Sequence, residues 1–324
     1  MANTLWTRRV GPVAFGVMET VVVGARGSRL AQAMVAEFLA RLGGPCPVVN
    51  FRNRVVMTDG DRDRRSSLRE VSGASGTGSG AFSNQLGQEL LEGRIDVAVH
   101  SLKDLPTAMP EGLVLAVTPP REDVHDALCG STLAGLRRGA RVGTGSPRRA
   151  AQLKALRPDL TIIPIRGNVP PRLAKLKTGM DAVVLAAAGL RRLGLADSIT
   201  ELLPLDDFPP SPGQGAMGIQ LRAADSELWE MLNSYGDPAA DAAVLAERAL
   251  LAELHGGCSV PVGAYAMHSG DGLKLTAQVT SLDGSQRVFS FATGTDAKRL
   301  GETLARTMLE QGAEAILRQI RVTV

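Results

Sequence analysis

The sequence is poor in aromatic residues and cysteines, and it has no long apolar run. Aromatic side chains make up 3% of the 324 residues, too few for a surface on which nucleic-acid bases stack. No apolar stretch reaches the about 18 residues that a membrane-spanning helix needs, and the net charge of +3 provides no broad basic surface. We therefore expect neither a nucleic-acid partner nor a membrane-spanning segment.

The three cysteines are widely spaced, at Cys46, Cys129 and Cys258, and they match neither a disulfide framework nor a zinc site. The four histidines are equally scattered. Both observations predict a reduced, cytoplasmic protein without a metal site. Residues 1–18 lack a convincing signal-peptide pattern, and we expect them to form a loose N-terminal tail.

Arginine supplies most of the positive charge. Six of the 36 basic residues are lysines, which leaves thirty arginines. Genomic base composition is the simplest explanation of this excess. Clustering of the arginines would instead favour an anionic ligand, because a guanidinium group binds a carboxylate or phosphate through two parallel hydrogen bonds.

Short β-branched runs alternate with helical patterns along most of the chain, which predicts an α/β fold. Strands are expected at residues 20–24, 95–99, 140–143, 161–165 and 181–185, and helices at residues 30–42, 85–91, 150–156 and 172–177. V-G-A-R-G-S (Val23–Ser28) and V-G-T-G-S (Val142–Ser146) both place a strand before a glycine turn and a hydroxyl group. We infer two similar lobes around a cleft, with ligands bound outside the carboxyl ends of the strands.

The last part of the chain has a different pattern. A helix is expected at residues 239–254, strands at 260–266, 273–280 and 287–292, and a final helix at 297–317. Glycine-containing turns between these strands are typical of hairpins. The pattern predicts a small C-terminal α+β domain. Elsewhere, the charged and then Gly/Ser-rich residues 59–80 predict either a mobile lid or an unstructured loop.

Polar and basic motifs follow the predicted strands. His100–Pro106 (HSLKDLP) places Asp104 after a buried strand, where a carboxylate can stabilise a cationic intermediate or simply cap a helix. Gly143–Arg149 (GTGSPRR) brings hydroxyl groups and arginines to a helix N-terminus, which favours anions. Arg166 and other arginines near strand ends each fit a solvated surface, whereas a convergent set favours a polycarboxylate ligand. A lone cysteine is usually inert, yet the two glycines before Cys258 leave room for a covalently attached group.

Taken together and in this order, the motifs resemble those of the porphobilinogen deaminase (hydroxymethylbilane synthase) family over roughly residues 20–320. Each piece alone is common, whereas the set is specific. The matching pieces are T-D-G-D (Thr58–Asp61), A-V-H-S-L-K-D-L-P-T (Ala98–Thr107), R-E-D (Arg121–Asp123), V-G-T-G-S-P-R-R (Val142–Arg149), I-R-G-N-V (Ile165–Val169), L-A-A-A-G-L-R-R-L-G (Leu185–Gly194), P-G-Q-G-A (Pro212–Ala216) and G-G-C-S-V-P-V-G (Gly256–Gly263).

The resemblance implies an α/β protein with two periplasmic-binding-protein-like lobes around a cleft and a small C-terminal α+β domain. We expect domain 1 at residues 19–119 and 216–236, with a mobile lid at 59–80, domain 2 at 120–215 and domain 3 at 237–324. The family joins four porphobilinogen molecules into linear hydroxymethylbilane and releases ammonia at each addition, a step of tetrapyrrole and heme biosynthesis. Its primer is a dipyrromethane cofactor held by a thioether, here to Cys258.

The resemblance also assigns roles to residues of the motifs. Asp104 is implied as the catalytic residue, which hydrogen-bonds pyrrole N–H groups and stabilises developing positive charge. The groups implied to bind cofactor and substrate carboxylates are Arg26, Ser28, Lys103, Thr144, Ser146, Arg148, Arg149, Arg166, Arg172 and Arg192. No metal is implied. We expect a cytoplasmic monomer whose substrate is porphobilinogen.

Several positions depart from the family pattern. Met34 replaces a common glutamine, Ser79 and Asn84 replace common lysines, Pro171 replaces a hydroxyl residue, and the lid is a few residues longer. Two alternatives therefore stay open. One is a divergent paralogue with altered pyrrole coupling or binding, and the other is a non-catalytic anion-binding module that releases no ammonia.

Overall fold

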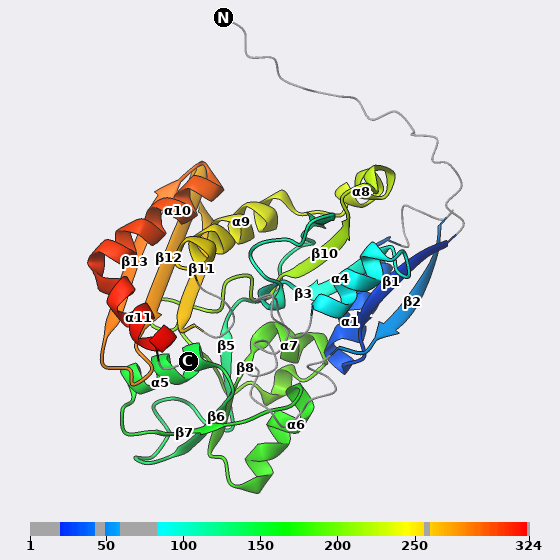
Figure 1. Ribbon diagram of the computed structural model, residues 1–324. Coiled ribbons are helices and arrows are strands. Elements are labelled where there is room, and N and C mark those ends of the chain that lie inside the picture. Colours follow the sequence, from blue (N-terminus) through cyan, green and yellow to red (C-terminus); the bar gives the residue numbers. More distant parts are fainter. Residues whose placement is uncertain (1–19, 43–48, 59–82, 256–259, 323–324) are drawn as a thin grey trace, which may run out of the picture.

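Figure 1 shows the computed structural model of the protein, which describes residues 20–42, 49–58, 83–255 and 260–322. The predicted N-terminal tail, the lid at residues 59–80 and the cysteines Cys46 and Cys258 lie outside the described residues. The described chain forms three sheets, each with helices packed against it. No helix of these residues is long and apolar enough to cross a membrane.

The first sheet has the strand order β2-β1-β3-β10-β4. Its elements are β1 (Thr20–Arg26), α1 (Arg29–Leu42), β2 (Asn50–Val56), α4 (Asn84–Leu91), β3 (Val97–Ser101), the 3₁₀ turn η1 (Leu102–Asp104), β4 (Leu113–Val117), β10 (Met217–Arg222) and α8 (Ser226–Asn233). β1 is parallel to β2 and β3, whereas β10 is antiparallel to both β3 and β4. The chain therefore returns to the first sheet after it has built the second.

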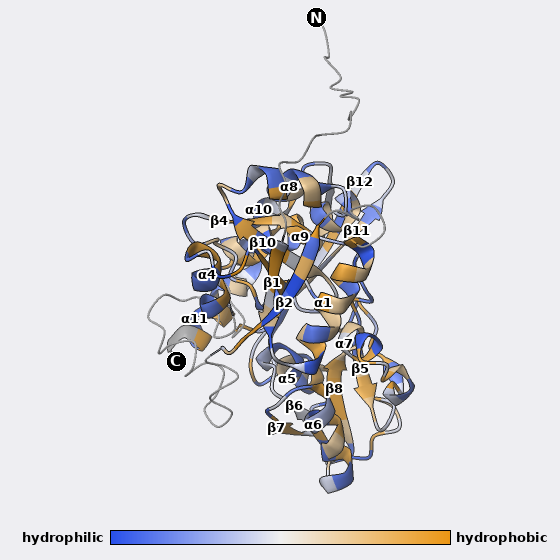
Figure 2. Cartoon of the chain, turned by 90° about the vertical axis from the view of Figure 1, so that its right-hand side faces the viewer, coloured by the Kyte–Doolittle hydropathy of each residue, from blue (hydrophilic) through white to orange (hydrophobic). Residues whose placement is uncertain are grey.

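The core of this sheet follows from alternation along β1 and from the helical period of α1. Val21, Val23 and Ala25 are fully buried and belong to one core with Val35 and Phe38 of α1. The edge strand β2 is mostly exposed and polar, as Figure 2 shows. Polar residues on an edge strand discourage pairing with other chains. They also hide the strand from a search for apolar periodicity, which explains why β2 was not predicted.

The second sheet has the strand order β7-β6-β8-β5-β9. Its elements are β5 (Asp126–Cys129), β6 (Arg141–Thr144), α5 (Pro147–Leu156), β7 (Thr161–Pro164), α6 (Val169–Leu173), η2 (Ala174–Thr178), β8 (Ala182–Ala186), α7 (Ala187–Arg192), η3 (Ala196–Ser198) and β9 (Glu201–Leu202). β6 is parallel to β7 and β8, and β5 is antiparallel to β8 and β9. Residues 118–125 and 203–216 connect the first two sheets.

The third sheet is an antiparallel meander of the order β11-β12-β13. Its elements are α9 (Pro238–Glu253), β11 (Val262–Ser269), β12 (Gly272–Thr280), β13 (Arg287–Gly294), α10 (Ala297–Met308), the π-helical turn η4 (Leu309–Ala313) and α11 (Glu314–Val322). α9 and α10 pack closely at Gly301, which has no side chain. A Cβ atom on this residue would lie 2.3 Å from the carbonyl oxygen of Ala246 and would not fit. The helices cover one face of the sheet in a separate apolar core.

The predicted fold class, two α/β units followed by a small α+β unit, is confirmed. Two predicted helices are wrong in extent. The final helix is interrupted because Gly312 adopts a left-handed φ of 106°, which separates α10 from α11. The helix expected at residues 172–177 starts at Val169 and ends at Leu173, and a 3₁₀ turn covers the remainder. The domain boundaries stay a prediction.

Candidate active site

Hydroxyl groups stand at the starts of the helices that follow β1 and β6. The Ser28 Oγ accepts a hydrogen bond from the Ala31 N–H at 3.2 Å at the start of α1. The Ser146 Oγ accepts one from the Arg149 N–H at 3.4 Å and caps α5, and the Thr144 Oγ1 accepts one from Ser146 N–H at 3.2 Å. These hydroxyls fix the turns and keep their own protons for a ligand.

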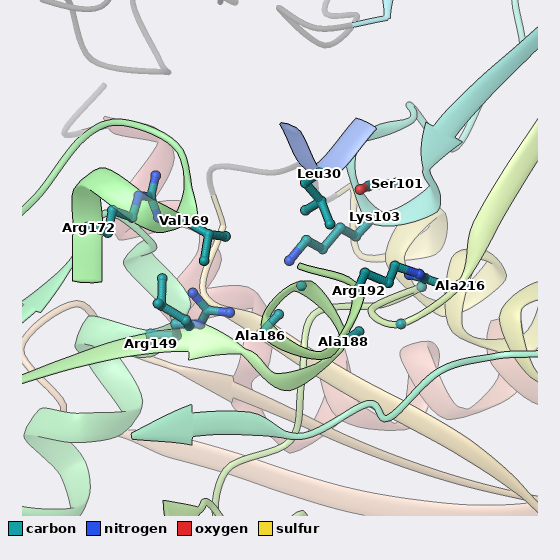
Figure 3. A pocket seen from close by; sticks show the side chains of 14 residues that line it. Leu30, Ser101, Lys103, Arg149, Val169, Arg172, Ala186, Ala188, Arg192 and Ala216 are labelled. Carbon is teal, nitrogen blue, oxygen red and sulfur yellow. The ribbon is translucent and has the colours of Figure 1, made fainter. Parts of the chain in front are cut away.

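A pocket that is partly open to solvent lies between the first and second sheets. The residues that line it come from α1, β3 and its following turn, α5, α6, β8, α7 and the 203–216 connection. Among the described residues of the lining, four are cationic and none is acidic: the cations are Lys103, Arg149, Arg172 and Arg192. In Figure 3, Arg149 and Arg172 lie on one side of the pocket, and Lys103 extends toward them from the other side.

The positive charges in the pocket repel one another, which disfavours the charged form of each side chain. Burial, together with the charge of Arg149, lowers the pKa of Lys103 to about 8 against the opposing effect of Asp104. Burial, together with the charges of Arg149 and Arg166, lowers the pKa of Arg172 to about 10, again against Asp104. Burial and neighbouring like charges both disfavour a cation. A bound polycarboxylate would relieve this repulsion, so the pocket is suited to an anionic ligand.

Asp126 supplies the counter-charge behind the pocket. Its fully buried carboxylate accepts hydrogen bonds from Arg149 Nε at 2.9 Å and Nη2 at 2.6 Å, and Arg148 Nη2 lies 2.7 Å from its other oxygen. Burial alone would raise the pKa of Asp126, but Arg148 and Arg149 hold it well below its usual range. Gln214 donates a further hydrogen bond to this carboxylate at 2.9 Å. The group stays ionised and fixes Arg149 at the pocket wall.

The structure separates the two adjacent arginines of the G-T-G-S-P-R-R motif. Arg149 lines the pocket, whereas Arg148 does not and is 3% exposed. Besides Asp126, Arg148 Nη1 donates to Gln152 Oε1 at 2.8 Å and to the Pro209 carbonyl at 3.0 Å. The structure gives Arg148 a supporting position behind the wall.

The other predicted site residues take different positions. Lys103, Arg149, Arg172 and Arg192 are brought together in the pocket lining. Asp104 follows Lys103 directly, and its charge acts on both Lys103 and Arg172. The remaining described ones do not belong to the lining of this pocket: Arg26, Ser28, Thr144, Ser146 and Arg166. Cys258 lies outside the described residues.

Gln214 is a site residue that the sequence interpretation missed. It is fully buried, and its Oε1 accepts hydrogen bonds from Lys103 Nζ at 3.2 Å and Arg149 Nη2 at 3.4 Å. Its Nε2 donates to the Val124 carbonyl at 2.8 Å. The P-G-Q-G-A motif was the available signal. His100, in contrast, is buried against Gln220 and carries a pKa lowered by burial to about 4, so it is neutral and structural.

The fold and the pocket define a class of α/β protein with a cationic pocket between two lobes. Two family models match the chain: "Porphobilinogen deaminase, dipyromethane cofactor binding domain" at residues 21–230, and "Porphobilinogen deaminase, C-terminal domain" at residues 242–310. The chain belongs to the porphobilinogen deaminase family, whose members are transferases.

Relatives match nearly end to end. The porphobilinogen deaminase of Roseiflexus castenholzii is 44% identical over 92% of this chain and 98% of its own length. That of Desulforudis audaxviator is 46% identical over 93% of this chain and 98% of its own. Among solved structures, the methionine-binding protein MetQ covers 68% of this chain at 11% identity with a TM-score of 0.43, covering 92% of its own chain.

The described residues fit the cofactor of this family. A dipyrromethane carries several carboxylate groups, and the pocket offers four cations with no carboxylate in its lining. Arg192 adds a buried Nη2 that has no hydrogen-bond partner among the described residues. Guanidinium and ammonium groups of this kind are the donors that carboxylates prefer.

We predict that Asp126→Asn lowers the free energy of unfolding by about 3–5 kcal/mol, because two buried arginines lose their counter-charge. The native carboxylate stabilises the fold above its unfolded pKa of about 4 and ceases to do so as pH falls through its lower folded value. The free energy of unfolding of the variant should therefore decrease less than that of the wild type as the pH falls. Urea unfolding at several pH values measures both effects.

The control is Glu302→Gln, which breaks an exposed ion pair with Lys298 and should change stability by less than about 1 kcal/mol. Equal stability of Asp126→Asn and the control would show that the buried cluster does not stabilise the fold.

Proposed function

We propose that the protein is a hydroxymethylbilane synthase, which condenses four porphobilinogen molecules into linear hydroxymethylbilane. Each addition forms one carbon–carbon bond and releases one ammonia, and water releases the finished product. The observation that carries this assignment is the pocket whose described lining residues include four cations and no acidic side chain, in a chain of the porphobilinogen deaminase family. Each added pyrrole brings an acetate and a propionate, so the ligand's charge matches the pocket.

The binding residues divide into two groups. Lys103, Arg149, Arg172 and Arg192 hold carboxylates inside the pocket. Around it, the groups assigned to the remaining carboxylates are Arg26, Ser28, Thr144, Ser146, Arg148 and Arg166, with Arg148 acting through Asp126. The dipyrromethane attached to Cys258 supplies, when bound, the pyrrole carbon on which the product is built.

Asp104 is the proposed catalytic residue. It lies at the end of η1, directly after the pocket residue Lys103. A carboxylate there accepts hydrogen bonds from pyrrole N–H groups. It also stabilises the positive charge that develops as ammonia leaves. The surrounding cations bind the peripheral carboxylates and leave this single negative group for the reacting pyrrole.

The assignment extends to cellular context. We propose a monomer in the cytoplasm that acts on a small molecule, and the three-domain division given above. The support is the scattered cysteine pattern and the separate cores of the three sheets.

A divergent paralogue with altered pyrrole coupling is the second candidate, because one departure from the family pattern reaches the pocket. Met34 is buried on α1, and its Sδ accepts a hydrogen bond from the Ser101 Oγ at 3.7 Å. Ser101 lines the pocket. A glutamine in place of Met34 would offer this hydroxyl different partners. Product analysis separates the candidates, since a product other than the linear tetrapyrrole favours the paralogue.

The intact mass of the purified protein tests the function. We expect a starting mass above the polypeptide by two linked pyrrole units, and a ladder of single-unit additions after porphobilinogen is supplied. Cys258→Ala should have the bare polypeptide mass. The control is Cys129→Ala, because Cys129 is fully buried and burial raises the pKa of its thiol to about 11. Attached pyrrole on Cys258→Ala would refute the attachment site, and an unchanging bare wild type would refute the function.

Asp104→Asn should fold normally and reduce turnover by about 10²-fold to 10³-fold, because an amide cannot balance developing positive charge. The rate of ammonia release measures this loss. Glu111→Gln, which changes an exposed carboxylate nearby, should keep the wild-type rate. Ammonia release by Asp104→Asn within a few-fold of wild type would contradict the catalytic role.

The pKa of about 8 at Lys103 predicts a pH dependence of substrate binding. The ammonium is charged below this value and loses its charge as pH rises through it, so kcat/KM should fall on the alkaline side. Lys103→Arg keeps the charge and should move this fall to higher pH. Steady-state kinetics between about pH 7 and pH 9.5 tests the shift. An unchanged alkaline limb would assign the titration to another group.

A further inference from the structure

An ion pair connects the first lobe to an arginine of the pocket. Glu37 on α1 accepts a hydrogen bond from Arg192 Nε on α7, with 2.8 Å between Nε and Oε2. The two helices lie side by side in Figure 1 although they belong to different sheets. Leu30, seven residues before Glu37 and on the same helix face, also reaches α7, since a Cβ atom on Gly189 would lie 3.5 Å from its Cδ2.

The side chain of Arg192 is buried although one of its hydrogen-bond donors is unsatisfied. Its side chain is 7% exposed, and its Nη2 is buried without a hydrogen-bond partner among the described residues. A buried donor without an acceptor destabilises the protein. Arg192 also lines the pocket. Since Glu37 occupies Nε, the Nη groups remain for a ligand.

The other oxygen of Glu37 makes only an exposed contact. Its Oε1 accepts a hydrogen bond from Arg41 Nη2 at 3.2 Å, one helical turn further along α1. Exposed pairs of this kind contribute little. The hydrogen bond between Arg192 Nε and Glu37 Oε2 is therefore the contact that orients the Arg192 guanidinium.

We propose that Glu37 is a positioning residue, which orients Arg192 across the two lobes so that its guanidinium receives a carboxylate of the pyrrole substrate. The proposal rests on the proposed function. Glu37 has two opposite effects on an anionic ligand, because its charge repels the ligand while its hydrogen bond preorganises the arginine. The geometry favours the second effect, since the carboxylate binds the Nε edge and leaves the remaining donors directed elsewhere.

The test compares Glu37→Gln and Glu37→Asp with the control Arg41→Ala. We expect Glu37→Gln to raise KM for porphobilinogen about fivefold to tenfold, with kcat within about twofold of wild type. Glu37→Asp keeps the charge but shortens the reach, so it should raise KM as well. Arg41→Ala removes only the exposed partner of Glu37 and should leave KM within about twofold.

Equilibrium binding separates this proposal from the proposed function. The probe is a pyrrole with acetate and propionate groups but no aminomethyl group, which binds without reacting. Its dissociation constant should rise for both Glu37 variants by the same factor as KM. A wild type that binds the probe without turning over porphobilinogen would refute the function, while the binding data would still decide the role of Glu37. An unchanged or lower dissociation constant in Glu37→Gln, or an equal increase in Arg41→Ala, would overturn the proposal.

Discussion

The buried carboxylate of Glu247 is the contact on which the arrangement of the three sheets depends. It is fully buried on α9 and accepts hydrogen bonds from Arg121 Nη1 at 2.7 Å and Nη2 at 2.9 Å. It also accepts the backbone N–H groups of Gly213 and Ala266 at 2.7 and 2.8 Å. One side chain thereby binds both connections between the first two sheets and the first strand of the third. A carboxylate has about four acceptor positions, and all are used here.

The second constraint is the concentration of positive charge in the pocket. Four cations of the described residues face one cavity; Arg149 pairs with the buried carboxylate of Asp126, and Arg192 pairs with the partly exposed Glu37. Burial and neighbouring like charges lower the pKa values of Lys103 and Arg172. The contacts of Glu247 also reach this pocket, because Gly213, whose N–H Glu247 binds, belongs to the lining.

Local pattern predicted the elements whose side chains have one buried face. β1, α1, β8 and α9 combine apolar periodicity with turn residues, and each lies close to its predicted range. β2 was missed because it is exposed at the edge of its sheet. The break at Gly312 was missed because a glycine inside a helical pattern has no unique conformation until packing selects one.

The sequence predicted the site residues that belong to motifs near the ends of predicted strands. Lys103, Arg149 and Arg172 each sit beside a recognisable glycine, proline or strand end, and parallel strands bring such positions together. The contacts that adjacent residues of one motif make were not predictable from the sequence. Arg148 and Arg149 are adjacent, yet one helical step turns Arg148 toward Gln152 and away from the pocket. Glu37 belongs to no motif, and its partner is 155 residues away in the sequence.

Helix α9 also contacts the segment that follows the proposed catalytic residue, through the residue next to Glu247. The next residue, Arg248, donates hydrogen bonds to the carbonyl oxygens of Leu105, Pro106 and Thr107 at 3.3, 2.6 and 3.2 Å. These three residues follow Asp104 directly. A rigid helix therefore holds the two connections between the lobes through one residue and the turn after Asp104 through the next. The same helix ends at Glu253, five residues before the proposed cofactor cysteine in the sequence.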